Sequence, residues 1–182
     1  TTVAAINGRC FSTGNKLYHS GVYMNDVSGY VLGYVVGEST SPQLVNLTNI
    51  ENSEISSYEG KNLFVKNGSA MDCFVAETLD YLLEYEKENF KKQSLVSYYT
   101  VFDTDPLAHS NDNNITRNAS INIENIGIYD RDVDPVFAGY GVHPSDLVFV
   151  ETYDYRNYIN DINLFHERPV VIMDIGVSTS RG

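Results

Sequence analysis

Three carboxylates in this sequence could together hold a divalent cation. Glu77 lies in a segment with helical periodicity, Asp103 follows an apolar strand-like run, and Asp174 lies near the end of another such run. Magnesium prefers oxygen ligands, and paired Mg²⁺ ions can stabilise both the attacking and the leaving oxygen of a phosphodiester cleavage. The alternative is that Glu77 is a solvated helix residue and that Asp103 only ends a strand.

The order of these elements adds to the metal-site hypothesis. Over residues 1–105 a turn-rich β region is followed by the helix that carries Glu77 and by the strand that ends at Asp103. This order resembles that of ribonuclease-H-like folds, and the resemblance implies a metal-dependent nuclease. Where that fold places its leading aspartate, this chain has Asn7-Gly8-Arg9.

A second candidate chemistry uses a thiol. Cys73 lies in the first turn of the expected helix, where the helix dipole lowers the pKa of a thiol and favours the nucleophilic thiolate. His143 precedes a β-rich run at 147–150 and could supply a partner imidazole. This helix-then-strand order resembles papain-like peptidases, which implies a cysteine hydrolase. The alternative is that Cys73 is a small core residue beside Phe74 and Val75.

The element that must position these groups is a long amphipathic helix that begins after Ser69. Ser69 and Asp72 have the spacing of a capping box, and the apolar residues that follow recur at steps of three and four. The helix is followed by the aromatic and β-branched run 95–102, which favours a buried strand, and Pro106 ends that run. We therefore expect a helix that packs on the sheet it leads into.

The remaining chain predicts short strands separated by turns. Asn7-Gly8 and Gly14-Asn15 are turn dipeptides, so residues 1–36 are interpreted as an antiparallel meander. Further strands are expected at 44–50, 62–65, 121–128, 136–140, 147–153 and 169–175, with a short helix at 154–164. The predicted fold class is α+β: one domain over 1–182, with a mostly antiparallel sheet, one long helix and an exposed loop near 106–118.

Composition excludes several classes of partner. The net charge is −12 with only 12 lysines and arginines, so duplex nucleic acid and anionic membranes are unfavourable partners. No apolar run approaches the roughly 20 residues of a membrane span. Two cysteines without metal-ligand spacing predict neither a disulfide scaffold nor a bound cofactor. We expect a soluble protein that is intracellular or part of a virion.

Tyrosine is unusually abundant, with 14 residues and no tryptophan. Tyrosine combines a large rigid area with a polar tip and is enriched in interfaces. The leading functional hypothesis is therefore a non-enzymatic structural or interaction subunit of a protein assembly, similar in composition to viral and phage components. Its partners would be protein subunits, in a homo- or hetero-oligomer. The expected interface anchors are Tyr98, Tyr99, Tyr140, Tyr153 and Tyr155.

Overall fold

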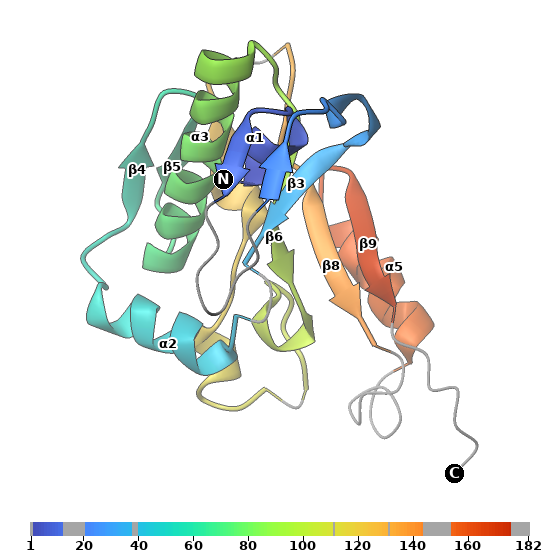
Figure 1. Cartoon of the computed structure of the whole chain (residues 1–182). Coiled ribbons are helices and arrows are strands. Elements are labelled where there is room, and N and C mark those ends of the chain that lie inside the picture. The colour runs from blue at the N-terminus through green and yellow to red at the C-terminus, as the bar shows by residue number, and fades with distance from the viewer. Residues whose placement is uncertain are drawn as a thin grey trace.

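The computed structural model combines helices with three sheets (Figure 1). It describes residues 2–12, 21–37, 40–110, 112–130, 132–143 and 154–175. The α-helices are α1 (Thr2–Ile6), α2 (Pro42–Glu51), α3 (Ala70–Phe90) and α5 (Tyr155–Phe165). The strands are β1 (Cys10–Ser12), β2 (Gly21–Tyr23), β3 (Gly33–Val36), β4 (Ser57–Glu59), β5 (Leu63–Lys66), β6 (Leu95–Thr100), β7 (Ile126–Ile128), β8 (Ala138–Val142) and β9 (Val170–Ile175). Short 3₁₀ turns are η1 (Ser28–Tyr30), η2 (Phe102–Thr104), η3 (Thr116–Asn118) and η4 (Ile123–Asn125).

The capping box at the start of α3 is confirmed. The Ser69 hydroxyl accepts the Asp72 N–H at 3.0 Å, and the Asp72 carboxylate accepts the Ser69 N–H at 2.9 Å. The helix ends at Phe90, and the C-cap residue Lys91 has a left-handed φ of 57°. The two bonds of the capping box satisfy backbone N–H groups at the start of α3 that have no acceptor within the helix. The expected strand after the helix is also present, as β6.

The main sheet corrects the predicted topology. Its strand order is β3-β6-β8-β9, and each neighbouring pair is parallel. The expectation of a mostly antiparallel sheet is therefore wrong for this sheet. Antiparallel pairing is found in the β1-β2 hairpin and in the three-stranded sheet β4-β5-β7.

Two segments that were expected to be strands are helices. Residues 1–6 were expected to open a meander, but Thr2–Ile6 forms α1. Residues 44–50 were expected to form a strand, but they belong to α2, where Ser41 caps the first turn and Pro42 occupies a favoured first helical position. The short C-terminal helix and the last strand are confirmed as α5 and β9, and the strand expected at 147–153 lies outside the described residues.

Helix α3 packs against both larger sheets (Figure 1). Its buried side chains include Val75, Leu79 and Leu83, which join one core cluster with Val96 of β6 and Tyr140 of β8. Helix α5 adds Tyr158 and Ile162 to the same cluster. Both helices therefore lie on one face of the parallel sheet, which is called here the core face.

Candidate interaction surface

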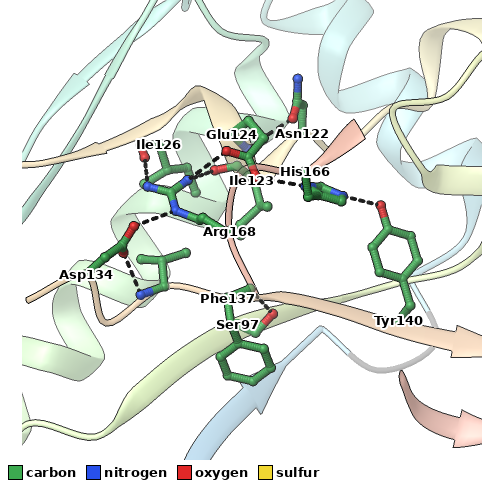
Figure 2. A network of polar contacts seen from close by, with 11 residues as sticks. Ser97, Asn122, Ile123, Glu124, Ile126, Asp134, Phe137, Tyr140, His166 and Arg168 are labelled. Atoms are coloured by element: carbon green, nitrogen blue, oxygen red, sulfur yellow. Dashed lines mark hydrogen bonds and ion pairs between the residues drawn. The ribbon is translucent and has the colours of Figure 1, made fainter. Parts of the chain in front are cut away.

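A buried polar network holds the C-terminal part of the core together (Figure 2). His166 lies between two partners: its Nδ1 is 2.8 Å from Glu124 Oε1, and its Nε2 is 2.8 Å from the Tyr140 hydroxyl. A carboxylate only accepts, so Nδ1 carries a proton and donates to Glu124, while Nε2 shares a second hydrogen bond with the Tyr140 hydroxyl. An acid–imidazole–hydroxyl chain of this kind could relay protons, but the Tyr140 side chain is buried, with only 1% of its surface exposed.

Arg168 extends this network to the turn η4. Its guanidinium donates to the carbonyl oxygens of Ile123 and Ile126 and pairs with Asp134 through Nε at 2.8 Å (Figure 2). Two backbone carbonyls and one carboxylate thus converge on one planar donor group, which is the arrangement that arginine satisfies and lysine cannot. The network therefore holds η4 against β8 and the segment before β9. The polar groups described here are engaged by contacts within the chain.

A second buried cluster follows β6. Asp105 accepts from the Tyr158 hydroxyl at 2.7 Å and from the Leu107 N–H at 2.9 Å, and it pairs with His109 Nε2 at 2.9 Å. The His109 ring stacks on Phe102 with ring centroids 3.9 Å apart. The loop expected to be exposed near 106–118 is therefore anchored at its start, because the His109 side chain is almost fully buried.

The Asp105–His109 pair predicts a pH dependence of stability. Burial lowers the pKa of His109, but the hydrogen bond and charge of Asp105 outweigh burial and hold this pKa above its usual value. Burial also raises the pKa of Asp105, against its hydrogen bonds. Both groups bind protons more tightly in the folded state, so the stability contributed by His109 is full below about pH 6.5 and is lost as the pH rises through its raised pKa.

Urea unfolding between pH 6 and pH 9 measures this effect. We expect the free energy of unfolding to fall across this range, and we expect His109→Gln to flatten the dependence. If the free energy of unfolding changes with pH in the same way in the wild-type chain and in the variant, the assignment to His109 is contradicted.

The opposite face of the parallel sheet is apolar, and no helix of the described part of the chain lies over it (Figure 1). We call it the open sheet face. Its residues come from all four strands and their flanks: Leu32, Val35, Leu95, Phe137, Val171 and Met173, which line most of an apolar groove of about 250 Å³. Leu32 is 79% exposed, Val35 is 40% exposed and Val171 is 38% exposed. Parallel sheets are normally covered on both faces, so this apolar face is a candidate binding surface.

The small residues of β8 shape this face. Alternate residues of β8 lie on opposite faces, so Ala138 and Tyr140 pack in the core while Gly139 and Gly141 belong to the open sheet face. A Cβ at Gly139 would lie 2.7 Å from atoms of Met173 and Ser97, and one at Gly141 would overlap the Tyr99 ring. The glycines therefore let the flanking side chains close over β8.

A second apolar surface lies on α2. Leu44, Leu47 and Ile50 are all more than half exposed, at a spacing that places them along one side of the helix, whereas Val45 is fully buried. Between α2 and the start of α3 lies a cavity of about 620 Å³. It is lined mostly by polar side chains, among them Asp72, Arg117 and Asn125, and Asp72 already accepts from Ser69, Asn122 and Asn125.

The three carboxylates proposed as metal ligands lie on different elements. Glu77 is exposed on α3, Asp103 is exposed on η2, and Asp174 is exposed on β9. Within the described ranges, no group of three or more His, Cys, Asp or Glu side chains could hold a metal ion. Asp174 instead lies beside His143, with Oδ2 and Nε2 3.4 Å apart.

Each residue of the proposed thiol–imidazole pair has other partners in the structure. Cys73 is a free, buried cysteine in the core cluster, and burial, together with the charge of Asp72, raises the pKa of its thiol. The expected lowering by the helix dipole is therefore corrected, because burial penalises the thiolate more strongly. His143 follows β8 and pairs with Asp174.

The five tyrosines expected to anchor an interface have different environments. Tyr98 and Tyr140 are core residues, which corrects their assignment as surface anchors; the Tyr98 hydroxyl lies 2.9 Å from Thr40 Oγ1. Tyr99 and Tyr155 are partly buried, and Tyr153 lies outside the described residues. Sequence reasoning missed the open sheet face, although the continuous apolar run at 170–173 is typical of a strand in a parallel sheet.

A comparison of the chain with protein-family models, with curated proteins and with solved structures finds no match. Among the helices of the described residues, none is both long enough and apolar enough to cross a membrane.

Proposed function

We propose that this chain is a non-enzymatic interaction subunit of a protein assembly and that it binds its partner through the open sheet face. The observation that carries the proposal is the apolar second face of the parallel sheet. Both α3 and α5 pack on the core face, and the groove around Leu32, Val35 and Val171 is apolar and accessible. Removing exposed apolar area of this kind from water is favourable, so a partner that covers it is bound more tightly.

Several features of the described residues fit this function better than catalysis. The two polar clusters that could relay protons are buried and are saturated by contacts within the chain. The Cys73 thiol is held in its protonated form by burial, and the three candidate metal ligands do not converge. The exposed side chains of α2 supply a second apolar surface through which a subunit could contact a neighbour.

Site-specific photo-crosslinking tests the proposal. A benzophenone amino acid is placed at Leu32 or Val171 on the open sheet face, and at Leu164 on α5 as a matched control that is 73% exposed. In the cells from which the chain comes, we expect discrete protein adducts from positions 32 and 171 and at least fivefold less from position 164. Equal labelling at the three positions, or no adduct at 32 and 171, would contradict the proposal.

A further inference from the structure

Among the described residues, strand β3 is an edge of the parallel sheet and has backbone groups without a partner. It pairs with β6 alone, with Gly33 opposite Leu95 and Val36 opposite Tyr98. Gly33–Val36 makes no other backbone hydrogen bond in the part of the chain that the structure describes. A strand edge of this kind is a template for pairing with another extended segment.

Two apolar pockets lie on the two sides of this edge. On the open sheet face, Gly33 and Val35 line the groove of about 250 Å³. On the core-face side, Tyr34 and Val36 join Tyr81 and other residues of α3 and α1 to line a pocket of about 360 Å³. Val35 belongs to both pockets. Because side chains of an extended chain alternate between faces, a strand added beside β3 would direct successive side chains into the two pockets in turn.

The other edge of the sheet is less suited to pairing. Strand β9 has a register shift opposite Tyr140 and Gly141, and it carries the exposed charge of Asp174. Irregularity and charge are common devices that protect an edge strand. Strand β3 is regular in its pairing and carries no charged residue.

Charge selects among possible occupants. Of the described residues that line the two pockets, Asp134 alone is charged, and the chain has a net charge of −12. A second copy of this chain would bring the same negative charge, whereas a segment with basic residues around an apolar stretch is complementary.

We infer that β3 binds an extended segment of a partner protein as an added strand, and that this segment is apolar with basic flanks. The inference rests on the proposed interaction function and specifies its partner. Main-chain hydrogen bonds to Gly33–Val36 supply the affinity, and the two pockets select the side chains at alternate positions.

The test uses a nine-residue peptide in which five alternating valine and threonine residues lie between pairs of lysine. A matched peptide with N-methyl groups at alternate central residues keeps its side chains but loses backbone donors. Titration of ¹⁵N-labelled protein should shift the amides of Gly33–Val36 and of Tyr81 on α3. We expect the N-methylated peptide to bind at least tenfold more weakly.

Variants of the protein locate the binding further. Val35→Lys places a charge of the partner's sign on the edge and should weaken binding at least tenfold, whereas Leu164→Lys adds the same charge on α5 and should leave binding unchanged. Three results of the peptide titrations would overturn the inference: no binding, equal binding of both peptides, or shifts confined to Val170–Ile175. A dimer of the chain that Val35→Lys disrupts would also overturn it, by identifying a second copy as the occupant. The two tests are separate. If any of these results were found together with photo-crosslinks at Leu32 and Val171, the proposed function would hold and only the pairing of a partner strand with β3 would be excluded.

Discussion

Replacing Asp80 with alanine is expected to lower the free energy of unfolding by about 3–4 kcal/mol, because it leaves three backbone donors, one buried and two in partly buried hydrogen bonds, without their acceptor. Asp80 lies on α3, with 3% of its surface exposed. Its Oδ1 accepts from the N–H groups of Asn62 and Leu63 at 2.7 and 2.9 Å, and its Oδ2 accepts from the N–H of Lys61 at 3.0 Å. One carboxylate thus fixes the β4–β5 turn against the helix, and urea unfolding measures its contribution.

Asp80→Asn is the matched control. The amide keeps one oxygen for two of the backbone donors but presents N–H groups where the other oxygen stood, so we expect about half of the alanine effect. A loss of less than about 1 kcal/mol in the alanine variant would show that water replaces the carboxylate.

The same residue gives a dependence at acid pH. Burial raises the pKa of Asp80, but the hydrogen bonds from Lys61, Asn62 and Leu63 outweigh burial and hold this pKa below its usual value. The stabilisation is therefore present above about pH 4 and is lost as the pH falls through the lowered pKa. The two contributions to stability therefore depend on pH in opposite directions: that of Asp80 is lost in acid, and that of His109 is lost in base.

Local signals were sufficient to predict the elements that depend on neighbouring residues. Ser69 and Asp72 fixed the start of α3 because a capping box is formed within four residues. The same kind of signal was present at Ser41 and Pro42, but the β-branched and aliphatic residues of 44–50 favoured a strand. Three of these apolar residues are exposed on α2 and only Val45 is buried, so the apolar spacing of this segment does not mark a helix face that packs in the core.

The pairing of the strands could not be predicted in this way. Gly33 pairs with Leu95 across two intervening helices and two strands of another sheet, and no local pattern records that contact. Turn dipeptides such as Asn7-Gly8 favoured a meander, although Gly8 in fact follows α1 with a positive φ of 67°. The open sheet face depends on the parallel pairing and on which face α3 and α5 cover, so it became visible only in three dimensions.

Replacing Arg168 with alanine is expected to lower the free energy of unfolding by about 3–5 kcal/mol, because two partly buried carbonyl groups each lose a charged hydrogen-bond donor. The Arg168 side chain is only 10% exposed and is the common partner of Asp134 and of two carbonyl groups. Without it, η4 and β7 lose their tie to the segment before β9. Hydrogen exchange should therefore accelerate first at Ile126–Ile128, and urea unfolding measures the total loss.

Arg168→Lys separates charge from geometry. Lysine keeps the positive charge but cannot reach Asp134 and both carbonyls with one planar group, so we expect it to restore less than half of the stability lost in the alanine variant. Full restoration by lysine would show that charge alone holds η4.

Since Glu124 of η4 also orients His166 beneath Tyr140, weakening this turn should loosen the core face under β8. The open sheet face is built on the other side of the same strand, so the rigidity of the proposed binding surface depends on the buried polar network behind it.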